Sequence, residues 1–222
     1  MTSEQLVAAL TRTSSVLLDF DGPVCSVFST FTPAAVAHEL RTALRLDAAP
    51  ETQEPFELLG YVARYEPTKL VSAEAELAQL EKMAVLRAEP TPDADAVLRH
   101  FSESGRPVVV VSNNSAAAVH AYLEEHGLDS LVASVSSRVN PDPSLLKPHP
   151  HLLHRAAAIL GCAVTDCLMI GDSATDIEAA RAAGAVAVGY ANKVGKRERF
   201  EHLGADAIIG AMSDLLDVRT PL

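Results

Sequence analysis

Cysteines are few in this sequence, and their arrangement argues against two kinds of stabilised site. Only Cys25, Cys162 and Cys167 occur in 222 residues, and no two of them have the CxxC spacing that is typical of zinc sites. An odd number also fits poorly with a disulfide framework, which secreted proteins build from pairs of cysteines. We therefore expect neither a disulfide scaffold nor a thiolate-bound zinc ion, and a reducing cytoplasmic environment.

Clustered positive charge and long apolar runs are missing as well. The formal net charge is -11, and no block of Lys or Arg occurs. Nucleic-acid binding depends on such clusters, so we expect no nucleic-acid partner. No segment approaches the ~18 consecutive apolar residues that cross a membrane, and the first residues, MTSEQLVAALTRTSS, do not resemble a secretory signal. We expect a cytoplasmic protein without a membrane partner. A monomer and a homodimer both stay open.

Short apolar runs alternate with helical patterns over most of the chain. We expect strands at Ser15–Phe20, Pro107–Val111, Asp166–Ile170, Ala185–Val188 and Asp206–Ile209. Helices are expected at Ala94–Ser104, Ala116–His126, His151–Leu160 and Asp176–Ala183, each followed at once or one residue on by glycine. This alternation is typical of βαβ units. The predicted fold class is therefore α/β, with a Rossmann-like parallel sheet and helices on both faces.

One region breaks the alternation directly after the first strand. It contains no convincing strand, but three helical stretches, Ala34–Leu46, Pro55–Ala63 and Ser72–Leu86. We expect residues 1–25 and 90–222 to form the α/β core and residues 26–89 to form a small all-helical cap. Active sites of open α/β sheets lie at the carboxyl ends of the strands, so a cap inserted here can act as a lid.

Polar side chains gather where the predicted strands end. Asp19 and Asp21 follow the first strand, with Gly22 and Pro23 next. The valine-rich strand is followed by Ser112, Asn113 and Asn114, and the strand at 166–170 by Gly171, Asp172, Ser173 and then Asp176. Lys147 begins a Lys-Pro-His-Pro turn before the helix at 151–160. In a parallel sheet these strand ends converge on one crevice.

Several carboxylates in one crevice repel each other, and a hard divalent cation is the usual remedy. All-oxygen ligands favour Mg²⁺. With Lys147 and a hydroxyl nearby, such a site suits a phosphoryl group that is attacked in line by a carboxylate. A second acid two residues along can protonate the leaving oxygen and later activate water. The residues alone therefore indicate magnesium-assisted phosphoryl transfer.

Four segments resemble the ordered motifs of the haloacid dehalogenase superfamily. They are Asp19-Phe-Asp21-Gly22, Val111-Ser112-Asn113, Lys147-Pro148 and Gly171-Asp172-Ser-Ala-Thr-Asp176. The resemblance extends from about Val16 to Leu216 and is greatest to phosphoglycolate-phosphatase-like members, which carry a helical cap between the first two motifs. Pro23 departs from the Thr or Val that most members have after the glycine.

The resemblance implies a role for each matching residue. Asp19 would be the nucleophile that forms an aspartyl-phosphate, and Asp21 the general acid and base, whose backbone carbonyl also binds Mg²⁺. Gly22, Ser112, Asn113 and Lys147 would contact the phosphoryl group, with Ser112 and Lys147 also serving catalysis. Asp19 and Asp172 would be metal ligands, with Asp176 behind them. The namesake dehalogenases lack an acid at the position of Asp21, so the implied reaction is hydrolysis of a small phosphorylated metabolite.

Other interpretations of the same residues stay open. Ser112–Asn114 could simply cap the helix that begins near Ala116, and Asp172 and Asp176 could complement a helix dipole. A phosphotransferase or sugar-phosphate mutase would use the same groups, and a catalytically silent binding protein could keep the fold. Candidates for gripping a substrate carboxylate from the cap are Arg41, Arg45, Arg64, Lys69 and Arg87, although a solvated helix face is the better interpretation for each.

Overall fold

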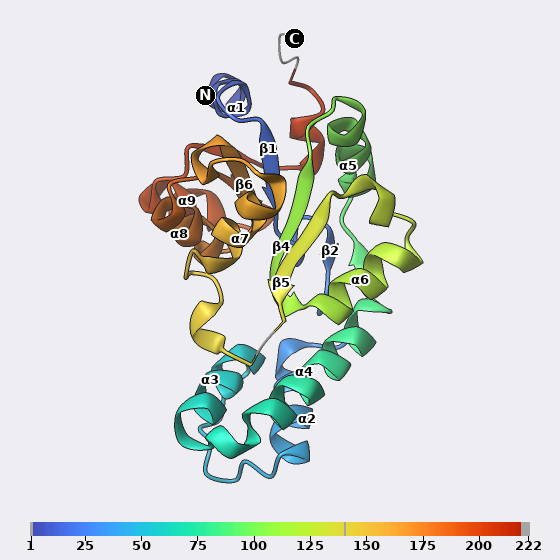
Figure 1. Cartoon of the computed structure of the whole chain (residues 1–222), viewed down its shortest axis with the longest axis vertical. Coiled ribbons are helices and arrows are strands. Elements are labelled where there is room, and N and C mark those ends of the chain that lie inside the picture. Colours follow the sequence, from blue (N-terminus) through green and yellow to red (C-terminus); the bar gives the residue numbers. More distant parts are fainter. Residues whose placement is uncertain (1, 140, 219–222) are drawn as a thin grey trace.

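Parallel strands form the central sheet of the computed structural model, which describes residues 2–139 and 141–218 (Figure 1). Within those ranges the sheet has six strands: β1 (Ser15–Leu18), β4 (Val108–Ser115), β5 (Ser134–Arg138), β6 (Cys167–Gly171), β7 (Val186–Tyr190) and β8 (Ala207–Ile209). Their order is β5-β4-β1-β6-β7-β8, and all neighbouring pairs are parallel. Because β1 lies between β4 and β6, the carboxyl ends of these three strands are adjacent.

Helices cover both faces of the sheet, which confirms the predicted fold class. Alternate residues of a strand point to opposite faces, and Leu17 and Leu18 accordingly pack into two different clusters of buried side chains. One cluster includes helices α1 (Thr2–Thr11), α5 (Ala94–Glu103) and α6 (Ala116–Glu125). The other includes α7 (His151–Leu160), α8 (Ala174–Ala183) and α9 (Lys196–Leu203).

Burial on both faces explains why the central strands are continuously apolar. Val108 to Val111 are at most 1% exposed, as are Val16, Leu17 and Leu18. Each side chain of this size contributes roughly 1.5–3 kcal/mol when it is fully removed from water. The glycines that follow three of the predicted helices, Gly127, Gly161 and Gly184, all have positive φ, as expected for the left-handed residue after a helix.

A helical lobe lies beyond the carboxyl ends of the central strands (Figure 1). It contains α2 (Pro33–Ala43), α3 (Pro55–Tyr65) and α4 (Leu70–Val85), whose apolar side chains form a third buried cluster. A short antiparallel ribbon of β2 (Cys25–Ser26) and β3 (Glu89–Pro90) joins the two connections to the core. The proposed cap, residues 26–89, begins and ends within this ribbon. At the end of α4, Ala84 and Val85 pack into the core cluster instead.

The observed element bounds differ from the predicted ones mainly at the site. β4 continues through Ser112, Asn113 and Asn114 to Ser115, although the predicted strand ends at Val111. A shift in the pairing with β5 between Ser112 and Ser115 accompanies this extension. Elements α1, β5, α9 and the β2–β3 ribbon were not predicted. Within the described ranges, no helix is both long and apolar enough to cross a membrane.

Candidate active site

A cavity of about 380 Å³ lies at the carboxyl ends of β1, β4 and β6, between the core and the cap. Most of the site residues predicted from the sequence contribute to its wall. The residues that line it are Asp19, Asp21, Glu54, Phe56, Glu57, Ser112, Asn113, Asn114, Lys147, Asp172, Ser173 and Thr175. Gly22 and Asp176 lie directly behind this wall. Gly22 lies against the carboxylate of Asp172, and Asp176 accepts a hydrogen bond from Lys147.

Asp19 follows β1 and is held in one orientation. Its backbone N–H donates to the carbonyl of Ile170 at 2.8 Å, so β6 fixes the chain at this point. Its Oδ1 accepts hydrogen bonds from the Phe20 N–H at 2.8 Å and from the Lys147 ammonium at 2.7 Å. Among the described residues no hydrogen bond reaches Oδ2. That oxygen is therefore available to attack an electrophile.

Lys147 connects two of the buried acids. Its Nζ donates to Asp19 Oδ1 at 2.7 Å, to Asp176 Oδ1 at 2.6 Å and to the carbonyl of Val111 at 3.1 Å. Burial by itself would lower the pKa of Lys147, but the carboxylates of Asp176 and Asp19 outweigh it and raise the pKa. The ammonium is therefore a permanent positive charge at the bottom of the cavity.

Burial raises the pKa of Asp19 well above its ordinary value, and the neighbouring Asp176 and Asp172 charges add to the effect, although Lys147 opposes it. Asp21 is only partly buried, and its Oδ1 accepts the Val27 N–H at 2.9 Å. Burial raises the pKa of Asp21 to about 6 despite that hydrogen bond. An acid with a pKa near neutrality can both give and take a proton.

Two glycines provide the space that two of the acids occupy. Gly22 has a φ of +106°, and a Cβ there would overlap the carboxylate of Asp172. A Cβ on Gly171 would overlap the carboxylate of Asp176 in the same way. Gly22 also accepts a hydrogen bond on its carbonyl from the Thr91 hydroxyl. Gly22 therefore has a steric role beside Asp172, which the sequence prediction of a phosphate contact did not include.

The acids at this edge form a group that suits a cation. One carboxylate oxygen from each of Asp19, Asp172 and Asp176 lies within 4.8 Å of the other two. Both oxygens of Asp176 already accept hydrogen bonds. Its Oδ1 accepts from Lys147, and its Oδ2 accepts from the N–H and hydroxyl of Ser173 in the capping box of α8. Asp176 is therefore better placed behind the ligands than among them. The donor chemistry is that of a hard divalent cation such as Mg²⁺.

Residues 14–184 match the family described as haloacid dehalogenase-like hydrolases. The chain belongs to this family. Its fold agrees, because CbbY from Rhodobacter sphaeroides, solved in complex with phosphate, superimposes with a TM-score of 0.72 at 17% identity over 91% of this chain and 96% of that one.

Two curated relatives of this dehalogenase-like hydrolase differ in how much of the chain they match. A phosphoglycolate phosphatase of Neisseria gonorrhoeae is 32% identical over 60% of this chain and 56% of its own length. The chain thus spans about half the length of the curated phosphoglycolate phosphatases that it matches. An uncharacterised hydrolase of Saccharomyces cerevisiae is 23% identical over 98% of this chain and 96% of its own.

In this hydrolase the residues Ser112–Asn114 at the end of β4 hold Lys147 and also form hydrogen bonds with one another. The Asn113 side chain bonds both backbone groups of Lys147: its Oδ1 accepts the N–H at 2.8 Å, and its Nδ2 donates to the carbonyl at 3.1 Å. The Ser112 hydroxyl accepts the Asn114 N–H at 3.0 Å and donates to Asn114 Oδ1 at 3.1 Å. Ser115, and not Ser112–Asn114, caps α6 through its own hydroxyl.

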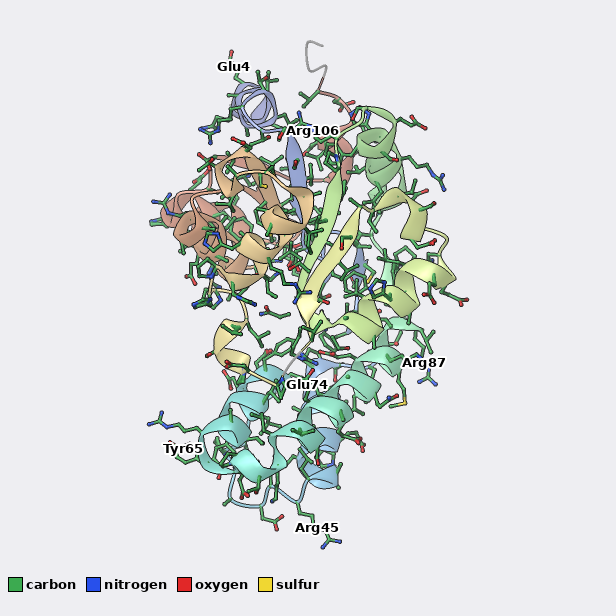
Figure 2. The ribbon with its side chains drawn as sticks, in the orientation of Figure 1. Glu4, Arg45, Tyr65, Glu74, Arg87 and Arg106 are labelled. Carbon is green, nitrogen blue, oxygen red and sulfur yellow. The ribbon has the colours of Figure 1, made fainter. Side chains whose placement is uncertain are left out.

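A buried ion-pair network joins the same segment to the cap. Arg138, at the end of β5, binds both carboxylate oxygens of Glu81 in α4, at 3.0 and 2.8 Å, and donates to the Asn113 carbonyl at 2.9 Å. Glu81 also accepts the Asn114 side-chain amide at 3.3 Å and the Ser115 N–H at 2.8 Å. Arg138 is 3% exposed and Glu81 fully buried, and Glu74 is a further partner of Arg138 at 2.8 Å. Figure 2 shows Glu74 where the cap meets the sheet.

The sequence did not predict this network, and it did not predict the two side chains that hold Asp172 in place. Asp172 Oδ2 accepts hydrogen bonds from Lys196 at 2.6 Å and Asn192 at 3.1 Å. Within the described chain the buried Oδ1 of Asn192 has no hydrogen-bond partner, which fits a hydrated cation nearby. The residues that were missed, Arg138, Glu81, Glu74, Asn192 and Lys196, lie outside the four motifs. A glutamate inside the apolar face of α4 was the one available signal for Glu81.

The cap cations that were candidates for a carboxylate contact do not line the catalytic cavity. Arg41 and Arg45 line a different cavity in the cap, together with Glu51, and Arg64 lines a neighbouring cavity of about 560 Å³. Lys69 pairs with Glu66 at 3.4 Å. Figure 2 shows Arg45 and Arg87 pointing away from the protein. No positive side chain of the described cap lines the catalytic cavity itself, and Arg64 lines the adjoining one, which shares Phe56, Glu57, Asn113 and Lys147 with it.

Proposed function

We propose that this protein is a Mg²⁺-dependent phosphatase that hydrolyses a small phosphomonoester through an aspartyl-phosphate on Asp19. The observation that carries the proposal is the arrangement around Lys147, whose ammonium holds Asp19 Oδ1 in a cavity with Asp21, Ser112 and Asp172 on its wall. The relatives named as phosphoglycolate phosphatases support the same reaction class.

The residues divide the reaction between them. Asp19 Oδ2 attacks phosphorus, and the P–O bond to the alcohol breaks as Asp21 gives its proton to the leaving oxygen. Asp21 then removes a proton from water, which attacks phosphorus, releases inorganic phosphate and restores the Asp19 carboxylate. Lys147, the Ser112 hydroxyl and the Asn113 N–H neutralise and orient the phosphoryl oxygens. In this scheme Ser112 rotates away from Asn114 when the substrate binds.

Asp19, the Asp21 carbonyl and Asp172 would hold Mg²⁺, with Asp176 behind them. The ion, when bound, would offset the charge of the acids and of the phosphoryl group. Lys147 opposes the rise in the pKa of Asp19 that burial causes, and its hydrogen bond to Oδ1 holds the carboxylate in one orientation. Asn113 in turn fixes Lys147 from both sides of its peptide unit.

Metal dependence gives the first test. Hydrolysis of para-nitrophenyl phosphate should stop when EDTA removes divalent cations and return when Mg²⁺ is added in excess. We expect Asp172→Asn to raise the Mg²⁺ concentration needed for half-maximal activity by at least about tenfold. The exposed Asp129, changed to Asn, is the matched control and should leave it unchanged.

Full activity in EDTA, or equal metal requirements for both variants, would contradict the metal assignment. Balanced release of alcohol and inorganic phosphate is expected of a phosphatase, whereas a deficit of phosphate would indicate transfer to a second substrate. A cytoplasmic location and a monomeric or homodimeric state stay predictions from the sequence.

A further inference from the structure

We propose that the organic part of the substrate carries no second anionic group, and that it presents hydroxyl or ammonium hydrogen-bond donors to the cap. This inference rests on the phosphatase function proposed above and specifies its substrate class. It concerns Glu54, Phe56 and Glu57 of the cap, which line the catalytic cavity together with the core residues.

The charge on the cavity wall is strongly unbalanced. Five carboxylates line it, those of Asp19, Asp21, Glu54, Glu57 and Asp172, and Lys147 is the single ammonium among the described lining residues. Outside the wall, the Lys196 ammonium pairs with Asp172 at 2.6 Å, so the carboxylates still outnumber the cations near the cavity. The Lys147 ammonium is already shared between Asp19 and Asp176. A bound Mg²⁺ would offset about the two charges of a phosphoryl group. A second anion, such as a carboxylate on the alcohol part, would therefore meet net negative charge.

The first turn of α3 does not offer an alternative anion site. A helix N-terminus attracts anions through its unpaired N–H groups and its dipole. Here Pro55 has no N–H, and the Glu57 N–H donates to the Glu54 carbonyl at 3.1 Å. Glu54 precedes the helix as its N-cap residue, and Glu57 lies in the first turn. The Glu57 carboxylate accepts a hydrogen bond from the Thr52 hydroxyl, which holds it in place. The protein's own acids thus complement this helix end.

Carboxylates at the mouth of a cavity are hydrogen-bond acceptors only, so they select donors. Phe56 lies between the two glutamates in sequence, and the Arg138 guanidinium lies over its ring, 5.5 Å from the centroid. The cap edge is therefore fixed to the buried Arg138–Glu81 network. The cap edge therefore presents two acceptors beside an aromatic ring, of which Glu57 is held by the Thr52 hydroxyl, and this favours a donor-bearing alcohol.

A size-matched pair of substrates tests the inference. Phosphoethanolamine and phosphoglycolate have two carbons each and end in an ammonium and a carboxylate respectively, while glycerol phosphate ends in neutral hydroxyls. With Mg²⁺ present, we expect kcat/KM to be lowest for phosphoglycolate. Glu54→Gln and Glu57→Gln keep the side-chain shape, and each should raise the ratio of phosphoglycolate to phosphoethanolamine turnover by at least about threefold.

The control is Glu51→Gln, which removes the same charge from an exposed position that lines the separate cap cavity. It should leave the ratio unchanged. A wild-type preference for phosphoglycolate over both other substrates would overturn the inference, as would a ratio that neither glutamine variant changes. Absence of Mg²⁺-dependent turnover even of para-nitrophenyl phosphate would instead refute the phosphatase function itself.

Discussion

Asp19→Asn is expected to lower kcat for every phosphomonoester by at least about 10³-fold, because an amide oxygen is a far weaker nucleophile than a carboxylate. The substitution keeps the shape of the side chain. Its Oδ1 can still accept from the Phe20 N–H and from Lys147. We therefore expect the loss to be chemical and not a consequence of unfolding.

Stability separates these two explanations. Burial and the Asp176 charge raise the pKa of Asp19, so in the metal-free protein its ionised form opposes folding at neutral pH. The uncharged amide removes that opposition. We expect the Tm of metal-free Asp19→Asn protein, measured by calorimetry at pH 7, to be at least as high as that of the wild type. A lower Tm together with retained activity would contradict the assigned role.

Glu81→Ala is expected to lower the free energy of unfolding by about 3–5 kcal/mol, because it leaves the Arg138 guanidinium buried without its bidentate partner. It also removes the acceptor for the Asn114 side chain and the Ser115 N–H. Denaturant unfolding measures the loss. Arg12→Ala is the control, because the Arg12–Asp206 pair is exposed and should contribute within about 1 kcal/mol.

A milder variant keeps this prediction testable if Glu81→Ala does not fold. Glu81→Gln retains one acceptor oxygen, so the segment Ser112–Asn114, which we propose contacts the phosphoryl group, should shift without collapse of the core. We expect kcat to fall by at least about tenfold, since small displacements of positioning groups are costly in catalysis. If Glu81→Gln matches the wild type in both stability and kcat, the network has no part in holding the segment.

The sequence predicted the core strands and the acids at their ends because both have strong local signals. Val108–Val111 is apolar at consecutive positions and is buried on both faces, as a central parallel strand must be. Strand β5 has no such signal, since Val135 is its one apolar residue. Its Ser136 and Ser137 are nevertheless fully buried, and Ser136 donates to the Leu152 carbonyl. Helix α9 buries only Phe200, so its sequence shows little apolar periodicity.

The contacts between core and cap were not predictable for a different reason. The cap partners of Arg138, Glu81 and Glu74, are 57 and 64 positions away along the chain, and no local pattern links them to it. Asn113 was predicted to use its backbone N–H on a phosphoryl group, and its side-chain clamp on Lys147 depends on a loop 34 residues away. Motifs identify which groups react, whereas the groups that hold them follow from tertiary packing.

Trapping the covalent intermediate tests the central claim most directly. Wild-type protein is mixed with Mg²⁺ and a phosphomonoester, quenched in acid within the first turnovers, digested, and analysed by mass spectrometry. We predict that the peptide containing Asp19 carries one additional phosphoryl group, and that the Asp19→Asn protein carries none. Steady turnover without phosphorylated Asp19, or with the group on another residue, would contradict the account.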